Sequence, residues 1–492
     1  MQTSDTNDQR AVRLEKLAKL RELGIQPYPE RYDTTSTCLG ARALPDGAKV
    51  RIAGRLMLFR SFGKLCFGHL QDPSGRVQVS FQRGELDEAT LKWVTKLTDI
   101  GDFLGIEGDL WTTKAGERTV QARAVTFLGK SLRPLPEKWH GLHDTDARYR
   151  RRYLDLLMSE ETRRVFHVRS RVVSLIRSYL DQNGFLEVET PMLQAAASGA
   201  AARPFATHHN ALDIDLYLRI SPETYLKRLV AGGMDRVYEI GRNFRNEGLD
   251  PSHLQEFTML EWYAAYWSYR DNMRFVRELI QTVVREALGT LKIQVGGNEI
   301  DLGGEWPERS YRELLFEDCG IDLAAHGDHR SLESAIKQKG IDLEFKKYRS
   351  RAALIDGLYK VVSRPKLIQP MFLTGHPTEL VPLARRSDAD PGTLDMFQVL
   401  VNTWEIVKAY SELVDPIDQR TRLEEQVTLR EAGDDETMMM EEDFLECMEH
   451  GMPPISGLGL GIDRFVALIT GQESLREVVF FPMMRSTTAD PG

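Results

Sequence analysis

The chain has few cysteines and no long apolar run. Its 492 residues include four cysteines, none of them in a C-x-x-C pair, which argues against a disulfide framework or a zinc site. No stretch of roughly eighteen or more apolar residues occurs, and the first ten residues, MQTSDTNDQR, lack the apolar segment of a secretion signal. These absences predict a soluble cytoplasmic protein with no membrane partner.

The usual nucleotide-binding motifs are also missing. Gly129, Lys130 and Ser131 look like the end of a P-loop, but Ala124 stands where its first glycine should be. Residues 457–464, GLGLGIDR, space their glycines by two, which fits neither a dinucleotide fingerprint nor a phosphate loop. Alternate glycines on one strand face would instead leave room for a flat group against the backbone.

Charge is spread unevenly over an ordinary globular composition. The net charge of −9 is unfavourable for binding nucleic acid, because phosphate contacts come from Lys and Arg. Near the N-terminus, however, basic and apolar side chains each recur every three residues. The basic set is Arg10, Arg13, Lys16 and Lys19, and the apolar set is Leu14, Leu17, Leu20 and Leu23. This spacing predicts a helix with one basic and one apolar face. The basic face either contacts nucleic acid or is simply solvated.

Two domains are predicted. Segments 50–58, 64–71, 76–82, 103–111 and 119–128 have the composition of short strands separated by turns, which is typical of a small five-stranded barrel. Such a barrel either binds unpaired bases on a strand face or has a purely structural role. We place the boundary near residue 145, after a polar segment with two prolines, so that residues 1–145 and 146–492 form separate domains.

The second domain is predicted to be α+β. Its apolar spacing predicts a helix over residues 163–183, ended by Asn183 and Gly184, and a strand over residues 188–193. Helices and β segments then alternate to about residue 304, and a mainly helical insertion follows at about 310–365.

A polar hairpin is predicted between residues 238 and 263. The first strand ends at Glu247 and the second restarts near Phe257. With a period of two, Arg245 and Glu247 share one face of the first strand, and Phe257, Glu261 and Tyr263 share one face of the second. Because buried charges are costly unless paired, these side chains indicate either a ligand cleft or a structural salt bridge.

A later predicted strand, residues 406–413, also carries charged and phenolic side chains. Lys408, Tyr410 and Glu412 share one of its faces. Glu405 falls on the opposite face unless a β-bulge intervenes.

Three segments resemble motifs 1, 2 and 3 of the class II aminoacyl-tRNA synthetases, in order and at suitable separations: GFLEVETPML at 184–193, FRNE at 244–247 and GLGLGIDRF at 457–465. Further stretches resemble the bacterial lysyl-tRNA synthetases, from about residue 10 to residue 485. The resemblance implies an N-terminal five-stranded OB-fold barrel that reads the anticodon, followed by an antiparallel-sheet catalytic domain. It also implies a homodimer held through motif 1, with tRNA(Lys), L-lysine and ATP as partners.

The resemblance assigns roles to residues of the cleft. Arg245 and Arg464 would act in catalysis, with Arg245 holding the lysine carboxylate and the α-phosphate of ATP. Glu247 would accept from the adenine amino group, while Phe257 and Arg464 stack on the two faces of the base. His253 would reach the γ-phosphate.

Lysine and the anticodon are assigned in the same way. The implied lysine-binding residues are Gly199, Glu223, Arg245, Glu261, Tyr263, Tyr410 and Glu412. Glu223 and the backbone of Gly199 would hold the α-amino group. The carboxylates and phenol near the ε-ammonium offer acceptors that a neutral side chain would leave unpaired. In the barrel, Phe67, Gln78 and Glu117 match the positions that read the anticodon.

Three positions depart from the family pattern. Gln398 replaces a glutamate that shares Mg²⁺ with the residue matching Glu405, and Lys408 replaces an asparagine near the substrate carboxylate. We hypothesise that the Lys408 ammonium partly substitutes for Mg²⁺, so that fewer ions are needed than is usual for the family; alternatively, Lys408 faces solvent. HLQEF at residues 253–257 replaces the usual HNPEF.

Other functions remain open at this point. One is a relative that attaches lysine to a protein, although such relatives typically lack the barrel. Another is a catalytically inactive regulator that binds lysine or a nucleotide. Aspartyl and asparaginyl synthetases share the architecture, but Glu261 and Glu412 do not suit an acidic or a neutral substrate.

Overall fold

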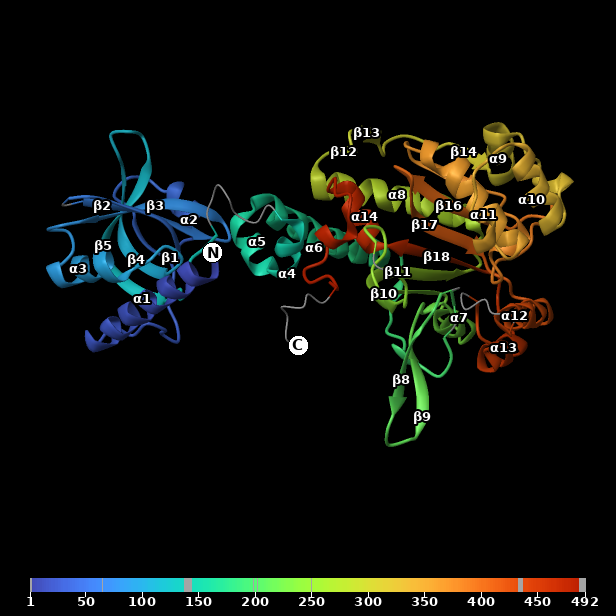
Figure 1. Cartoon of the computed structure of the whole chain (residues 1–492), viewed down its shortest axis with the longest axis horizontal. Helices are drawn as coiled ribbons and strands as arrows, with labels where there is room; N and C mark the ends of the chain where they lie inside the picture. Colours follow the sequence, from blue (N-terminus) through green and yellow to red (C-terminus); the bar gives the residue numbers. More distant parts are fainter. Residues whose placement is uncertain are drawn as a thin grey trace. The chain divides into compact units, whose positions relative to one another are not determined.

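The computed structural model describes residues 2–63, 65–136, 144–197, 199–200, 202–248, 250–431 and 437–485. The chain divides into two compact units, Met1–His143 and Asp144–Gly492 (Figure 1). Within the described residues, no helix has the length and apolar character needed to cross a membrane. Each unit has a hydrophobic core of its own.

The first unit is a closed β-barrel, which confirms the five predicted strands. They are β1 (Lys49–Phe62), β2 (Leu65–Asp72), β3 (Gly75–Gln82), β4 (Phe103–Thr112) and β5 (Arg118–Gly129), in the barrel order β1-β2-β3-β5-β4. Two short helices, α2 (Cys38–Arg42) and α3 (Glu88–Leu97), accompany them. Alternate side chains such as Leu56, Leu70 and Val79 fill the interior and are inaccessible to solvent.

Helix α1 (Gln2–Glu22) packs on the barrel, but the predicted division into a basic and an apolar face is wrong. Arg13 and Lys16 face the barrel together with Leu17 and Leu20, whereas Leu14 is exposed. A repeat of three drifts around a helix with 3.6 residues per turn, so a single face combines residues from both predicted sets.

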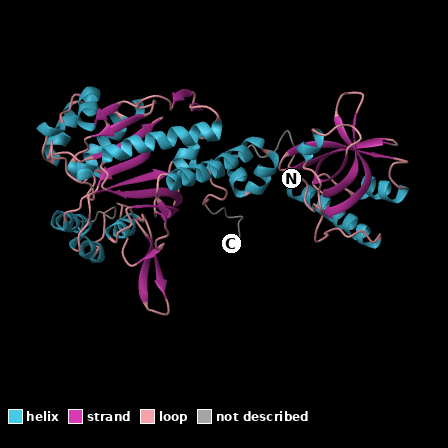
Figure 2. Cartoon of the chain, turned by 180° about the vertical axis from the view of Figure 1, so that it is seen from behind, coloured by secondary structure: helices cyan, strands magenta, loops and turns pink. Residues whose placement is uncertain are grey.

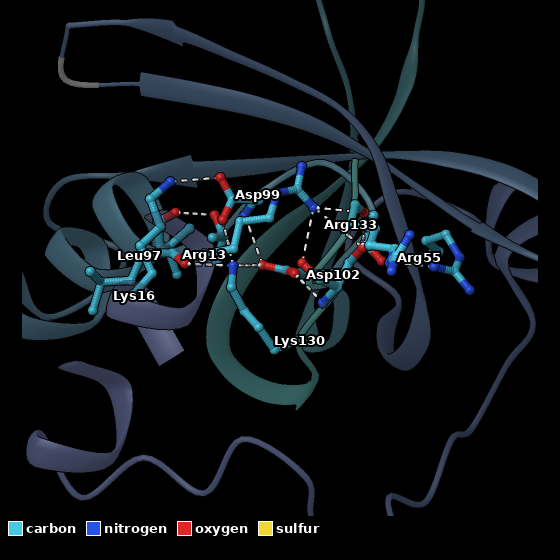
Figure 3. A network of polar contacts seen from close by, with 12 residues as sticks. Arg13, Lys16, Arg55, Leu97, Asp99, Asp102, Lys130 and Arg133 are labelled. Atoms are coloured by element: carbon cyan, nitrogen blue, oxygen red, sulfur yellow. Dashed lines mark hydrogen bonds and ion pairs between the residues drawn. The ribbon is translucent and has the colours of Figure 1, made fainter. Parts of the chain in front are cut away.

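Polar contacts dock this helix (Figure 3). The Arg13 guanidinium donates to the Ser131 carbonyl at 2.9 Å, and the Lys16 ammonium lies 2.6 Å from Asp99. Lys130, which mimics a P-loop lysine in the sequence, is instead buried between Asp99 at 2.5 Å and Asp102 at 2.8 Å. Two of the four basic side chains that suggested nucleic-acid binding, Arg13 and Lys16, therefore hold the unit together, whereas Arg10 and Lys19 are exposed.

The second unit is built on an eight-stranded sheet in the order β14-β15-β16-β17-β18-β11-β10-β6. The strands are β6 (Leu186–Glu187), β10 (Arg236–Phe244), β11 (Glu256–Ala265), β14 (Glu308–Ser310), β15 (Met371–Thr374), β16 (Met396–Val401), β17 (Trp404–Ser411) and β18 (Ile455–Gly461). All neighbours from β15 to β10 are antiparallel, and the outer pairs β14–β15 and β10–β6 are parallel. Smaller sheets are formed by β7 (Leu193–Gln194), β8 (Phe205–His209) and β9 (Ile214–Leu218), and by β12 (Lys292–Val295) and β13 (Asn298–Asp301).

Helices cover one face of this sheet. Helices α6 (Glu160–Gln182), α8 (Tyr269–Leu288) and α14 (Ile462–Ile469) share one apolar core with β11, β16, β17 and β18, and Figure 2 shows long helices in front of the strands. Helices α4 (Thr145–Arg150) and α5 (Arg152–Met158) precede α6. Helices α7 (Glu223–Ala231), α12 (Pro416–Glu431) and α13 (Glu442–Glu449) complete the unit. On the opposite sheet face, Met396 and Tyr410 pack with α12 and α13, and Val237 and Tyr263 pack with α7.

Helix α6 ends where the sequence predicts, with Asn183 as its cap and Gly184 in the left-handed conformation at φ +77°. The strand predicted at 188–193 is wrong. Strand β6 ends at Glu187, before this segment, and β7 begins only at Leu193. Between them, Val188 donates a hydrogen bond to the Tyr238 carbonyl at 2.9 Å. Pro191, which has no N–H, cannot continue a ladder.

Three helices lie between β14 and β15: α9 (Tyr311–Cys319), α10 (His329–Gln338) and α11 (Arg351–Val362). They bury an apolar cluster of their own, which includes Leu314, Leu332 and Leu354.

Candidate active site

A cavity of about 300 Å³ opens on the sheet, bounded by β11, β17, β18 and the start of α14. Phe257, Glu261 and Tyr263 share one face of β11, as predicted, and all three line the cavity. Because β18 pairs with β11, Gly459 lies opposite Glu261 and Gly457 lies opposite Tyr263.

The alternate glycines of β18 make room for side chains of the protein itself. A Cβ atom at Gly457 would overlap the Tyr263 ring and Glu412 Oε1, and one at Gly459 would lie 2.5 Å from Met259 Cε. At Gly457 the space expected for a flat ligand is thus taken by a ring and a carboxylate. This strand needs glycine because neighbouring strands project large groups over it.

The predicted end of the first hairpin strand is wrong. Strand β10 ends at Phe244, so Arg245 and Glu247 lie in the following loop rather than on a strand face. The Arg245 N–H still bonds across the hairpin to the Gln255 carbonyl at 2.9 Å. The Gln255 amide closes the loop by donating to the Gly248 carbonyl at 2.8 Å. Both predicted residues therefore reach the same cavity.

Two arginines and an aromatic ring line one end of the cavity. The Arg245 guanidinium lies 5.0 Å from the centroid of Phe257. Arg464, in the first turn of α14, donates to the Glu405 carbonyl at 3.2 Å and lies 3.4 Å from His253 Nε2. Positive charge beside an aromatic face suits a nucleotide with its base and phosphates.

A β-bulge settles the position left open for Glu405. The register between β16 and β17 shifts at Ile406, so that Gln398 pairs with Lys408 while Leu400 pairs with Glu405. The extra residue turns Glu405 onto the face that carries Lys408. Both side chains line the cavity.

Gln398 is held between two neighbours. Its amide nitrogen donates to Glu405 Oε2 at 2.5 Å, and its oxygen lies 3.1 Å from His376 Nε2. Burial lowers the pKa of His376 to about 3, so its ring is neutral at pH 7 and serves as a donor. Lys408, directly opposite Gln398, forms no ion pair with any residue that the structure describes.

Three buried carboxyl groups cluster near the other end of the cavity: Glu223 and Glu261 line it, and Glu412 lies against Gly457 of its wall. Glu223, Glu261 and Glu412 are 5 %, 4 % and 2 % exposed. Glu261 accepts from the Ser221 hydroxyl at 2.8 Å and from the Tyr263 hydroxyl at 3.1 Å. Burial, together with the nearby charge of Glu223, raises the pKa of Glu261 to about 8. Such crowding of acids is expected at a site that binds cations.

Gly199 and Tyr410 complete this end. The Tyr410 hydroxyl donates to Glu223 Oε1 at 2.7 Å. Gly199 has φ +81°, and a Cβ atom there would lie 3.1 Å from the Cβ atoms of Glu223 and Ser221. Glycine is therefore required both by the backbone conformation and by the close approach.

Lys227 is a site residue that the sequence did not indicate. Its ammonium lies 2.6 Å from Glu223 and 2.5 Å from Glu412, with the side chain fully buried. In the sequence, Glu223 and Lys227 look like an ordinary surface pair four residues apart on a helix. Ser221 was missed for a similar reason, because a serine before a helix is usually only a cap.

The three barrel residues lie in the other unit. Phe67 and Gln78 are on adjacent strands, and Gln78 donates to the Thr119 hydroxyl at 2.8 Å. That hydroxyl donates in turn to the Glu117 carbonyl at 3.1 Å, which brings Glu117 beside Gln78. The exposed ring of Phe62 meets Phe67 edge-on, with centroids 6.3 Å apart.

Comparisons with known proteins identify a family for each of the two units. Residues 144–485 match the family model of class II tRNA synthetases (D, K and N), and residues 50–128 match that of the OB-fold nucleic acid binding domain. The chain is 47 % identical to a lysine–tRNA ligase of Pelotomaculum thermopropionicum, over 98 % of this chain and 96 % of the relative. It is 45 % identical to that of Carboxydothermus hydrogenoformans and 46 % to that of Moorella thermoacetica, over 99 % of both chains in each pair.

Proposed function

The chain belongs to the class II tRNA synthetases and, within them, to the lysine–tRNA ligases, and from this membership we propose how its residues divide the reaction. Its partners are accordingly lysine, ATP and tRNA. A protein-modifying relative and an inactive regulator are not favoured, because the matching ligases cover almost the whole chain, barrel included.

The arginine end of the cavity binds ATP in this proposal. Adenine stacks between Phe257 and Arg464, and Glu247 accepts from its amino group. Arg245 contacts the α-phosphate and the lysine carboxylate, since a planar guanidinium can donate to two oxyanions. His253 reaches the γ-phosphate. The convergence of these side chains on one cavity supports the assignment.

The chemistry needs position and charge rather than a protein nucleophile. A carboxylate oxygen of lysine bonds to the α-phosphorus, and the bond from that phosphorus to pyrophosphate breaks. The terminal hydroxyl of tRNA then attacks the lysyl carbonyl carbon, and AMP leaves. Arg245 and Arg464 stabilise the charge that develops on the phosphate oxygens.

The observation that carries the lysine assignment is the cluster of three buried carboxyl groups, two of which line the far end of the cavity while Glu412 lies against Gly457 of its wall. Glu223 and the Gly199 backbone take the α-amino group, and Glu261, Tyr263 and Glu412 surround the ε-ammonium. Leaving these acceptors unpaired is costly, so amino acids with neutral side chains are rejected.

ATP–pyrophosphate exchange with each amino acid tests this pocket. We expect exchange with lysine alone, and a loss of about a hundredfold in kcat/KM for lysine in Glu412→Gln, because a charged hydrogen-bond acceptor is removed. Exchange with another amino acid, or an unchanged Glu412→Gln variant, would show that the pocket is wrongly assigned.

The family uses ATP with Mg²⁺ in general, but the residues here suit fewer ions. Among the described residues, no cluster of three or more His, Cys, Asp or Glu could hold a metal. Glu405 is a carboxylate that could share an ion with phosphates. Gln398 points its amide N–H at Glu405, so it does not supply the second oxygen. Lys408 supplies positive charge there instead.

Lys408→Asn tests this substitution for a metal. We expect the variant to need a several-fold higher Mg²⁺ concentration for half-maximal exchange, since a fixed cation near the phosphates is lost. Independently of activity, Mn²⁺ titration followed by electron paramagnetic resonance should count fewer ions per ATP-bound subunit in the native protein than in Gln398→Glu/Lys408→Asn. Equal ion counts together with unchanged Mg²⁺ dependence would contradict the proposal.

A homodimer through motif 1 is also proposed. Leu186, Met192 and Leu193 of that segment are 54 %, 44 % and 49 % exposed, and apolar side chains gathered on a surface favour association. Light scattering on the full chain should give the mass of two subunits at micromolar concentration. A single-chain mass would argue against this interface.

A further inference from the structure

A buried ammonium group of the protein itself lies beside the carboxylates at the far end of the cavity. Lys227 Nζ lies 2.6 Å from Glu223 Oε1 and 2.5 Å from Glu412 Oε2. The ring centroids of Tyr410 and Phe444 are 5.8 Å and 5.7 Å from the same nitrogen. Two carboxylates and two aromatic faces thus hold this cation in a fully buried position.

The formal charges of this cluster depend on Lys227. Glu223, Glu261 and Glu412 contribute three negative charges when ionised, and Lys227 contributes one positive charge. Arg219, another buried cation nearby, is paired with Glu239 at 2.6 Å. The cluster therefore carries a formal charge of −2 with Lys227 and −3 without it.

A charge of −2 matches the two ammonium groups of lysine, whose carboxylate faces Arg245 in the proposed function. Buried charge is tolerated when it is paired and is costly when it is not. Without Lys227, one carboxylate would stay unpaired when lysine is bound, or it would have to be protonated. With Lys227, all charges of the occupied site are balanced.

The other carboxylate oxygen of Glu412, Oε1, is not held by Lys227. Glu412 is 2 % exposed, and its Oε1 has no hydrogen-bond partner among the described residues. This oxygen points at Gly457, where a Cβ atom would overlap it. One oxygen of Glu412 is thus held by Lys227, while the other is buried against Gly457, a residue that lines the cavity.

We propose that Lys227 is a resident counter-ion of the lysine site: it sets the charge of the cluster and fixes Glu223 and Glu412 for the two ammonium groups of the substrate. This inference rests on the proposed lysine pocket. Lys227 acts through the two carboxylates and is a positioning residue. A substrate with a single ammonium group leaves one negative charge unbalanced, so Lys227 helps the site to demand two.

Binding of L-lysine to the full-length protein by isothermal titration calorimetry tests the proposal. Lys227→Met and Glu412→Gln should each raise the Kd for lysine on the order of tenfold to a hundredfold, as expected when one member of a buried charge pair is removed. The double variant Lys227→Met/Glu412→Gln returns the cluster to a charge of −2 and buries no unpaired charge. It should bind lysine about tenfold more tightly than Glu412→Gln alone.

Lys227→Met should thus weaken lysine binding in the native protein but strengthen it in Glu412→Gln. A residue that only fills space would behave differently, because its loss would weaken binding in both backgrounds. Lys337→Met is the matched control: Lys337 also follows a glutamate by four residues on a helix, but its side chain is 57 % exposed. It should leave the Kd for lysine unchanged. A double variant that binds no more tightly than Glu412→Gln overturns the inference. An unchanged Kd in Glu412→Gln instead overturns the lysine pocket itself.

Discussion

At the scale of the single residue, Glu261 is a buried carboxyl group that has no ion-pair partner among the described residues. It accepts hydrogen bonds from Ser221 and Tyr263. Burial, with the nearby charge of Glu223, raises its pKa to about 8. At pH 7 the carboxyl of the empty site is therefore mostly protonated. An arriving ε-ammonium favours the ionised form.

Lysine binding should consequently release about one proton from Glu261 at pH 7. Affinity for lysine should rise with pH up to about pH 8. Above that value no proton remains to be displaced from Glu261, and the α-ammonium of the substrate begins to lose its own proton, so the rise should end. Calorimetry in buffers of different ionisation enthalpy measures the proton count. Glu261→Gln should release fewer protons than the native protein, because burial also raises the pKa of Glu412 and leaves that group as a second source. A pH-independent affinity in the native protein would refute the assignment.

A substitution at Gly457 tests the lysine pocket in a second way. A methyl group there would overlap both the Tyr263 ring and Glu412 Oε1, so Gly457→Ala must displace one or both of them. We expect the KM for lysine in ATP–pyrophosphate exchange to rise about tenfold or more, with a much smaller change in the KM for ATP. Gly461→Ala is the control, because its new Cβ atom would meet only Arg464 carbons, the nearest at 3.7 Å.

At the scale of the element, buried charges hold the barrel to its helix. Lys130 is surrounded by Asp99 and Asp102, and Asp99 also binds Lys16 of α1 (Figure 3). Burial raises the pKa of Asp102, whereas hydrogen bonds from the two lysines lower that of Asp99. Removal of the shared cation would leave two acidic groups without their main partner.

Lys130→Met should therefore destabilise the barrel unit by about 3 kcal/mol, because it breaks a buried charge pair. Hydrogen exchange of α1 and β4 amides in the full chain measures the change, as faster exchange that is confined to the first unit. Arg83→Ala removes one side of the exposed Arg83–Glu88 pair and should change exchange little. Equal effects of the two substitutions would contradict this account.

At the scale of the whole molecule, the two units have separate cores and separate candidate sites. Phe67 lies in the barrel, while every residue assigned to lysine and ATP lies between residues 199 and 464. A change on the barrel surface should therefore alter the use of tRNA and leave the activation of lysine intact.

Phe67→Ala tests this separation. Loss of one stacked base costs about 1–3 kcal/mol, so the KM for tRNA(Lys) in aminoacylation should rise roughly fivefold to a hundredfold. ATP–pyrophosphate exchange without tRNA should stay unchanged. Phe316→Ala removes an exposed aromatic ring from the second unit and should affect neither assay. A parallel loss of both activities in Phe67→Ala would show that the units do not work separately.

The sequence alone was enough to predict those features that depend on a pattern within a few neighbouring residues. The five barrel strands follow from alternation over a few residues, and the end of α6 follows from Asn183 and Gly184. The common face of Phe257, Glu261 and Tyr263 follows from the period of a strand. Ordered motifs then indicated the family, because their residue types meet the demands of one reaction.

Tertiary contacts decided the rest. The face of α1 is chosen by Asp99 and the Ser131 carbonyl, far away in the chain, and the bulge at Ile406 depends on pairing with β16. Lys227 looks like a surface lysine until α7 packs beside Glu412 and buries it. The sequence thus determined which groups are available for the reaction. Only the folded chain decided which of them are desolvated together, and desolvation is what turns an ordinary ion pair into a strong one.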